Sequence, residues 1–570
     1  MNQIIRNPVG TGPWSAFPQR RLAWLGIGYL TLIWAFSIVV GLGCSNQLTY
    51  HEAFVAQGAR EILASGDWWY PRIGGLPWLE KPPLPFWLVA ASGWAAGEIS
   101  PTVARLPSAL AALGLVLGVG MLAAYRYGPV IAVLAGAMQA TTAWTVLRGR
   151  LAEADILLAC AITWAIVAFD RLRIREGQQD QGSACGKTSR AWQLWRWVFF
   201  GLLGITSFIK GTGFGCALVL CTVALVAIWD RDQTLRARLR FPAGWLLAGF
   251  LTVSWPLAMV RQHGLKVIGL WLLHVTSRLS TSATHGIIAR ESWSEYVLDI
   301  LGQGLPWTPL ALIGAIGLIP RVLAAPGRGR PGPADQERVN AALGDRLLWA
   351  WALGPLVLVS LASARNAHYA IHAMIPWSIW SAVEVSALGS WLCKRGWPRK
   401  RAARLVFGTL TGLAAAYGLG FWLVAPWFDH RSGEAAFYRQ VGRQTPASEH
   451  LELLYDDWDR EPYPTPFGPI PHDLALRLYY LDRPAGWHFH TESLMDCTSE
   501  CPGDPERSGS DLSVNVIGRE RDLPALRALG EVEVLQSSSG YRWDRTYLLA
   551  QIRSSRALAS SARGDIQVSR

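Results

Sequence analysis

Charged residues are scarce in this chain of 570 residues. Asp, Glu, Lys and Arg make up only 16% of it, whereas 51% of the residues are hydrophobic. This composition is too apolar for a soluble protein of such length. The apolar residues gather in repeated runs of about 20 residues, which is the length that a helix needs to cross the hydrocarbon of a bilayer. The sequence therefore predicts an integral membrane protein.

Several common site motifs are missing as well. There is no glycine-rich phosphate-binding motif, which argues against direct use of ATP or a nucleotide sugar. The eight cysteines are scattered, and no Cys/His spacing is that of a zinc site. The net charge of +12 does not indicate nucleic-acid binding, because the basic residues gather in short loops between apolar runs. Such loops are typical of the cytoplasmic side of membrane proteins.

The apolar runs predict an all-α polytopic membrane protein with about eleven transmembrane helices. A further run, 84–96, is short for a span, and we expect it to be a juxtamembrane helix of the first external loop. With this run left out of the count, the four most basic loops all lie in the cytoplasm, as the positive-inside rule requires. The predicted spans are 22–43, 104–124, 129–147, 154–170, 195–209, 213–229, 242–261, 297–320, 347–362, 369–391 and 405–425.

The composition changes near residue 425. Residues 1–425 are predicted to form the transmembrane domain, and 426–570 a small extracytoplasmic α/β domain. In the second part strand-like and helix-like runs alternate, as in a small mixed domain. The strand-like runs are 451–455, 512–517, 532–535 and 547–552, and the helix-like runs are 473–480 and 523–529.

The stretch directly after the first span concentrates reactive side chains. It reads YHEAFVAQGAREILASGDWWYPRIGGLPWLEK over residues 50–81. An imidazole, carboxylates and a lysine occur here together with paired tryptophans, which favour the membrane interface. The residues of interest are His51, Glu52, Glu80 and Lys81.

Other polar residues near span ends are predicted on the same, outer side. Charges at membrane depth are costly, so they are usually functional or paired. The simpler alternative is that they neutralise each other or extend to water. Cations beside carboxylates suggest an anionic, lipid-linked substrate, with Lys or Arg holding phosphate and a carboxylate or imidazole acting as base. These residues are Asp155, Lys210, Arg278, Arg365, His368 and Tyr369.

Several motifs, in chain order, resemble those of one enzyme family. They are HEAFVAQGAREILASGDWWYPRIGGLPWLEKPPLPFWL in the first loop, RLAEADILLA at 150–159, FIKGTGFG at 208–215 and RNAHYAIHAMIP at 365–376. This set resembles the polyprenyl-phosphate-sugar glycosyltransferases of the C superfamily, a protein-mannosyltransferase-like group that includes the lipid A aminoarabinose transferases. The resemblance covers roughly residues 20–425.

The resemblance implies an enzyme of the bacterial inner membrane, surrounded by membrane lipids and with its active site and C-terminal domain on the periplasmic side. Such an enzyme moves a sugar from an undecaprenyl-phosphate-type donor to an acceptor. The acceptor would be a lipid A-like lipid, another envelope glycan or a protein. Two alternatives stay open, which are a transporter or flippase of a lipid-linked sugar and a non-catalytic relative.

The resemblance also implies roles for residues. Glu52 and Asp155 match acidic residues of the family, but His51 stands where the family has an aspartate. The catalytic base is therefore Glu52, Asp155 or His51 itself, and these three are also candidate ligands of a divalent cation. The residues predicted to bind the donor phosphate or substrate are Glu80, Lys81, Lys210, Arg278, Arg365, His368 and Tyr369.

Overall fold

The chain forms two compact units in this computed structural model. One unit is Met1–Cys44 with Leu79–Val424, and the other is Ser45–Trp78 with Ala425–Arg570. The boundary between Val424 and Ala425 lies one residue from the predicted boundary. Residues 45–78, however, group with the C-terminal part and not with the helices around them in sequence. The structure describes residues 19–43, 47–174, 190–230, 234–279, 292–323, 333–362, 365–429, 432–446, 449–455, 462–463, 465–494, 512–540 and 546–554.

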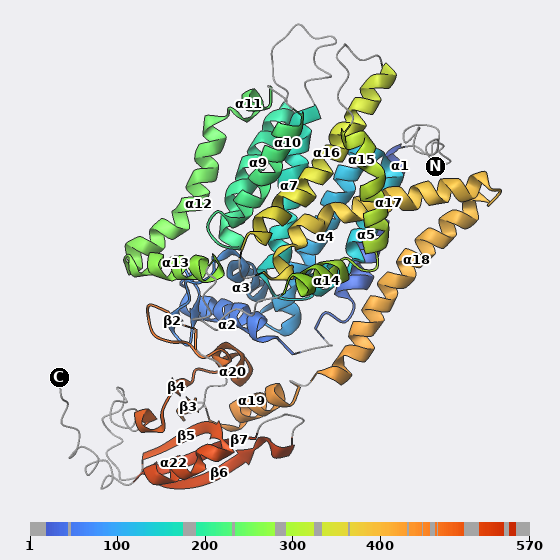
Figure 1. The fold of residues 1–570 in the computed structure, drawn as a ribbon. Coiled ribbons are helices and arrows are strands. Elements are labelled where there is room, and N and C mark those ends of the chain that lie inside the picture. Colours follow the sequence, from blue (N-terminus) through green and yellow to red (C-terminus); the bar gives the residue numbers. More distant parts are fainter. Residues whose placement is uncertain are drawn as a thin grey trace. The chain divides into compact units, whose positions relative to one another are not determined.

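The regular elements described in the first unit are all helical (Figure 1). They confirm the mostly helical fold that the sequence predicts. They are α1 (Gln19–Trp34), η2 (Ala35–Val39), α3 (Leu84–Ala96), α4 (Pro101–Tyr127), α5 (Pro129–Ala140), α6 (Ala143–Gly149), α7 (Ala154–Ile174), α9 (Arg190–Ile209), α10 (Phe214–Asp230), α11 (Thr234–Leu239), α12 (Pro242–His263), α13 (Lys266–Leu279), α14 (Trp293–Gln303), α15 (Thr308–Leu323), α16 (Pro333–Ser360), η3 (Ala367–Tyr369), α17 (Ile371–Lys394), α18 (Arg399–Leu419) and η4 (Gly420–Val424).

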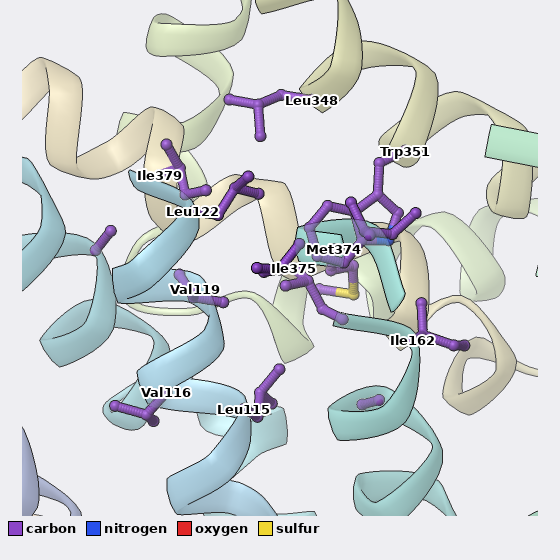
Figure 2. Close-up of a cluster of buried hydrophobic side chains, with 14 of the residues drawn as sticks. Leu115, Val116, Val119, Leu122, Ile162, Leu348, Trp351, Met374, Ile375 and Ile379 are labelled. Atoms are coloured by element: carbon purple, nitrogen blue, oxygen red, sulfur yellow. The ribbon is translucent and has the colours of Figure 1, made fainter. Parts of the chain in front are cut away.

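Helices α4, α7, α16 and α17 enclose the centre of the unit, and Figure 2 shows apolar side chains from all four meeting there. Small residues allow α4 and α7 to approach closely. A Cβ atom added at Gly118 of α4 would lie 2.9 Å from the Thr163 methyl of α7. One turn away, the Trp164 indole N–H donates to the Gly114 carbonyl at 2.9 Å. This contact fixes the position of α7, whose first turn contains Asp155.

Two predicted spans are not continuous helices. Helices α5 and α6 meet at 61°, and α14 and the first part of α15 meet at 97°. The second break follows from Pro306, which has no N–H to continue a helix. The two breaks supply each other's hydrogen bonds, since Ala143 N–H donates to the Leu305 carbonyl at 2.9 Å and the Trp307 indole donates to the Thr141 hydroxyl at 3.0 Å.

Within the described residues, four helices are long and apolar enough to cross a membrane. The number rises to six if each bent pair counts as one span. Three shorter apolar helices add to these, over Ala23–Val39, Leu84–Ala96 and Phe214–Asp230. The polytopic character agrees with the sequence, whereas the number of eleven spans stays a prediction.

The second unit contains a five-stranded sheet with the order β4-β3-β5-β7-β6. The central β3 is parallel to β4 and β5, while β7 is antiparallel to β5 and β6. This confirms the small C-terminal α/β domain. Its elements are α2 (Tyr50–Ser65), β1 (Arg72–Ile73), β2 (Leu76–Pro77), η5 (Ala425–Phe428), α19 (Ser432–Gln444), β3 (Leu451–Leu454), α20 (Leu474–Leu481), β4 (Gly486–His488), η6 (Thr491–Ser493), β5 (Leu512–Arg519), η7 (Glu520–Asp522), α22 (Leu523–Leu529), β6 (Glu531–Ser537), η8 (Ser538–Gly540) and β7 (Tyr547–Ser554).

Packing of α2 against α20 explains why 45–78 belongs to this unit. The Arg60 guanidinium donates to the Tyr479 carbonyl at 2.8 Å and lies 4.6 Å from the centre of that ring. The Leu48 N–H donates to the Tyr480 hydroxyl at 2.7 Å, in a fully buried position. Buried hydrogen bonds of this kind are costly to break, so they tie the first loop to the C-terminal fold.

Candidate functional site

A buried ion pair between Asp155 and Lys210 is the centre of the candidate site. The Lys210 ammonium pairs with the Asp155 carboxylate, and their side chains are 22% and 7% exposed. Asp155 lies in the first turn of α7, where the helix dipole favours a carboxylate. Lys210 directly follows α9, which packs against α7 along its length. The start of one helix and the end of the other therefore meet at this pair.

Two glycines turn the chain sharply after Lys210. Gly211 and Gly213 have φ of +67° and +80°, a region that residues with a Cβ rarely adopt. The Ser207 hydroxyl accepts a hydrogen bond from Gly213 N–H at 3.2 Å and closes the turn. Helix α10 then begins at Phe214. The sequence Lys-Gly-Thr-Gly-Phe thereby presents Lys210 at a sharp corner between two helices.

A second cation and carboxylate extend the pair. The Arg148 guanidinium lies 2.6 Å from the Glu153 carboxylate and 3.7 Å from the Asp155 carboxylate. Arg148 comes from the last turn of α6, so the bend between α5 and α6 directs this residue to the site. Two cations and two carboxylates thus lie together at one end of the helical unit.

Side chains at the start of α17 complete the site. The Lys210 ammonium lies 4.7 Å from the centre of the Tyr369 ring, a cation–π contact. Asp155 interacts electrostatically with His368. The Phe214 ring packs edge-on against Tyr369 and His372, with centroids 6.2 and 6.5 Å away. We call Arg148, Glu153, Asp155, Lys210, His368, Tyr369 and His372 the site cluster.

An apolar groove of about 450 Å³ adjoins the site cluster. It is bordered by α3, α4, α7 and α9, and its lining runs from Leu157 to Trp164 on α7 and from Val198 to Ile209 on α9. Two lining residues are close in sequence to the ion pair, because Ile209 precedes Lys210 and Leu157 follows Asp155 by two positions. At 1.5 Å per residue, the α9 side of the groove is about 16 Å long. The candidate site thus combines the charged site cluster with an apolar groove.

Of the residues that the sequence predicts for the site, the structure brings together Asp155, Lys210, His368 and Tyr369. Arg365 lies nearby in sequence, but its guanidinium is 4.2 Å from the Trp293 ring of α14. Glu80 and Lys81 are half-buried ahead of α3, and neither forms an ion pair with another described residue. Arg278 lies in α13, but its side chain is outside the described part of the chain.

His51 and Glu52 lie on α2, in the second unit. The Glu52 carboxylate accepts a hydrogen bond from Thr49 N–H at 2.8 Å, and Glu52 N–H donates to the Thr49 hydroxyl at 3.2 Å. This reciprocal arrangement is a capping box at the start of α2. Glu52 is fully buried and His51 is exposed. The catalytic roles given to both residues stay predictions.

The metal prediction also stays open. Among the residues that the structure describes, no three His, Cys, Asp or Glu side chains gather so as to hold an ion. His51 and Glu52 belong to one unit, and Asp155 belongs to the other.

The sequence assigns no role to Phe214, whereas His372 is one of the polar residues predicted on the outer side, at a position where a proline is common in the family. Phe214 has an ordinary apolar side chain, and only its position after the glycine turn could have marked it. His368 belongs to η3 and His372 to the first turn of α17, so helical spacing does not relate the two residues. The burial of His372 and the lack of partners for its ring nitrogens emerge only from the fold.

The sequence comparisons agree with these motifs. The family model of dolichyl-phosphate-mannose-protein mannosyltransferases matches residues 26–272. Undecaprenyl phosphate-alpha-4-amino-4-deoxy-L-arabinose arabinosyl transferase 1 of Sodalis glossinidius is 25% identical over 372 residues, which are 63% of this chain and 58% of that protein. The corresponding transferase of Edwardsiella ictaluri is 28% identical over 368 residues, 63% of this chain and 60% of its own. The match thus spans about three fifths of these relatives.

The fold extends the likeness further along the chain. The crystal structure of ArnT from Cupriavidus metallidurans bound to undecaprenyl phosphate has a TM-score of 0.65 with 17% identity, and the match covers 94% of this chain and 98% of that one. At this identity the likeness concerns the fold. Together the comparisons confirm the resemblance seen in the motifs: this chain resembles the C-superfamily polyprenyl-phosphate-sugar glycosyltransferases, in particular the lipid A aminoarabinose transferases.

Proposed function

We propose that this chain is an integral membrane glycosyltransferase that takes a sugar from a polyprenyl-phosphate donor. The observation that carries the proposal is the Asp155–Lys210 pair together with an apolar groove whose lining includes Leu157 and Ile209, neighbours of the pair in sequence. A polyprenyl-phosphate sugar has the matching shape, since its long hydrocarbon chain ends in an anionic phosphate. The isoprenoid chain would lie in the groove, and the phosphate would lie at Lys210.

The charges of the site fit the chemistry of this donor. The acceptor oxygen attacks the anomeric carbon, and the bond between that carbon and the phosphate oxygen breaks. The electron pair of the broken bond stays on the phosphate, whose charge Lys210 and Arg148 stabilise. A hydroxyl acceptor must also lose a proton, for which the Asp155 carboxylate is the nearest base in the site cluster. A phosphate acceptor needs no base. Displacement from the opposite face inverts the anomeric centre.

The relatives support the choice of donor. The transferases of Sodalis glossinidius and Edwardsiella ictaluri are named for undecaprenyl phosphate-aminoarabinose, and the ArnT structure of similar fold holds undecaprenyl phosphate. By analogy, we infer an undecaprenyl-type carrier. For the acceptor we propose an envelope component, namely a lipid A-like lipid, another glycan or a protein.

We further propose eleven spans, a place in the bacterial inner membrane and a site that faces the periplasm. The support is the charge of the loops: α7 ends with Arg171 and Arg173, at the end of the helix opposite to Asp155. Basic loop ends favour the cytoplasm, which leaves Asp155 on the outer side. A membrane-impermeant thiol reagent applied to intact spheroplasts should label Ser65→Cys and not Arg395→Cys, compared with the parent chain.

The function is tested with purified protein in lipid vesicles and radiolabelled polyprenyl-phosphate sugars. A glycosyltransferase moves label onto an acceptor lipid or protein and releases polyprenyl phosphate. Movement of the unchanged donor across the vesicle membrane would instead indicate a transporter, and absence of both would indicate a non-catalytic protein. Lys210→Ala serves as the control that should lose transfer.

A further inference from the structure

His372 is a buried histidine whose ring has no hydrogen-bonding partner. Its side chain is fully buried, with 0% exposed surface. Neither Nδ1 nor Nε2 has a hydrogen bond to any residue that the structure describes. Buried polar groups are nearly always bonded in folded proteins, and each one left without a bond costs about 1–3 kcal/mol. A side chain kept at such a cost points to a role other than stability.

Elsewhere in α17 two buried serine hydroxyls have partners, whereas the Trp380 indole N–H has none among the described residues. The Ser378 hydroxyl donates to the Gln139 side chain at 2.9 Å. The Ser381 hydroxyl donates to the Trp307 carbonyl at 3.2 Å. Both serines are as buried as His372. His372 differs from Trp380 in that both of its ring nitrogens lack partners among the described residues and in that it lies at the site cluster.

The surroundings of His372 indicate what it could bind. Lys210 and Asp155 both lie close enough to interact electrostatically with its ring. On another side it packs against the Phe214 ring. A neutral imidazole offers one N–H donor and one acceptor nitrogen. A donor beside the Lys210 ammonium suits an anion bound at that lysine, because hydrogen bonds to charged groups are the stronger ones.

We propose that His372 is a ligand-contacting residue whose ring N–H donates a hydrogen bond to the phosphate of the lipid donor held at Lys210. This inference rests on the proposed function and adds a residue to it. It also explains the missing partner, since the phosphate supplies the acceptor oxygen that the protein does not. In the unbound protein His372 then lowers stability, as groups preorganised for a ligand commonly do.

Two variants of the full-length protein in lipid nanodiscs test this role. His372→Leu keeps the volume but removes both nitrogens, whereas His372→Gln keeps an N–H donor. Polyprenyl phosphate and the corresponding polyprenol, which lacks phosphate, are the two probes. His372→Leu should weaken binding of polyprenyl phosphate at least about tenfold, the effect of losing a hydrogen bond to a charged group, and leave polyprenol binding unchanged. His372→Gln should restore most of the loss.

Thermal unfolding without ligand separates this role from a structural one. His372→Leu should unfold at the wild-type temperature or above it, whereas Ser381→Ala, which removes a satisfied buried hydrogen bond, should unfold below it. Reduced stability of His372→Leu, an equal loss for both probes, or unchanged binding of polyprenyl phosphate would each overturn the inference. If the wild-type protein itself binds no polyprenyl phosphate, the proposed function fails as well, so the two failures are told apart by the wild-type measurement.

Discussion

Helix α7 has ion-paired charges near both of its ends, and the two sets differ in how exposed their side chains are. Near its C-terminal end, Asp170 pairs with Arg126, and Arg173 pairs with Asp230. Arg346 from α16 lies 3.4 Å from Asp230 and joins the set. All these side chains are at most 6% exposed. We call Arg126, Asp170, Arg173, Asp230 and Arg346 the paired cluster.

The site cluster at the other end of α7 is more open. The side chains of Arg148, Glu153 and Lys210 are 25%, 16% and 22% exposed. It also contains His372, whose ring nitrogens have no hydrogen bond to any described residue. The paired cluster joins α4, α7, α10 and α16, and its charged side chains form ion pairs with one another. The site cluster keeps cations and a polar ring in reach of a ligand. Both clusters consist of ion pairs, and the comparison teaches that access to a ligand, more than pairing, separates the functional charges from the structural ones.

The largest expected effect on stability comes from replacing Asp170 of the paired cluster. Asp170→Asn removes the carboxylate that pairs with the buried Arg126, and it leaves Arg173 with Asp230 as its remaining carboxylate partner. Removing one member of a buried ion pair costs about 3–5 kcal/mol. We expect a large drop in the thermal unfolding temperature of the protein in detergent, together with reduced amounts of folded protein in the membrane.

A matched control for Asp170→Asn is Glu533→Gln, which breaks the exposed pair with Arg553. Both side chains of that pair are more than half exposed. Exposed pairs contribute little, so the unfolding temperature should hardly change. An Asp170→Asn protein as stable as the wild type would show that the paired cluster does not hold the helices together.

The site cluster should respond in the opposite way, with loss of activity and little loss of fold. Lys210→Ala removes the cation for the phosphate, and Asp155→Asn removes the carboxylate that pairs with it. We expect each variant to lower sugar transfer about 100- to 1,000-fold, the typical effect of removing a group that stabilises developing charge. Lys394→Ala, an exposed lysine at the end of α17, is the control. Near-normal turnover in both site variants would remove these residues from the mechanism.

Much of this arrangement is readable from the sequence. Asp155 and Lys210 stand out because each is a charge bracketed by apolar runs, and such residues are either functional or paired. His368 and Tyr369 lie at the start of a predicted span, on the side where the other candidates fall. In the C-terminal domain, alternation and run length predict β3, β5, β6, β7, α20 and α22, whereas α19 and β4 are not predicted. Local pattern suffices wherever the neighbours in sequence decide the structure.

What the sequence could not provide depends on contacts between distant residues. The first external loop joins the second unit through Arg60 and Tyr479, which are 419 positions apart. The two helix breaks satisfy each other through Ala143 and Leu305, a pairing that no local pattern reveals. One local signal was missed: Thr49 and Glu52 have the spacing of a capping box, which predicts a helix start.

Glu52 tests the distinction between structural and functional residues, because it caps α2 together with Thr49 and is also a predicted catalytic residue. Thr49→Ala removes the cap and should lower stability by about 1 kcal/mol with transfer retained. Glu52→Gln keeps an acceptor oxygen for Thr49 N–H, so the fold should be stable. If Glu52 takes a proton in the reaction, as its match to the family predicts, Glu52→Gln should lose transfer. Equal transfer in Glu52→Gln and the wild type would leave Glu52 with the capping role only.

The smallest expected effect concerns the aromatic face that Lys210 contacts. The Tyr369 ring lies 4.7 Å from the Lys210 ammonium, and a cation–π contact at a partly exposed site is worth about 0.5–1 kcal/mol. Tyr369→Leu should therefore raise the donor KM about two- to fivefold. Tyr369→Phe keeps the ring and should be close to wild type. A KM that rises equally in both variants would assign the effect to the hydroxyl group. A KM unchanged in Tyr369→Leu would mean that the aromatic ring does not help to position Lys210. Lys210 would then be held by its ion pair with Asp155, in the way that the charges of the paired cluster hold one another.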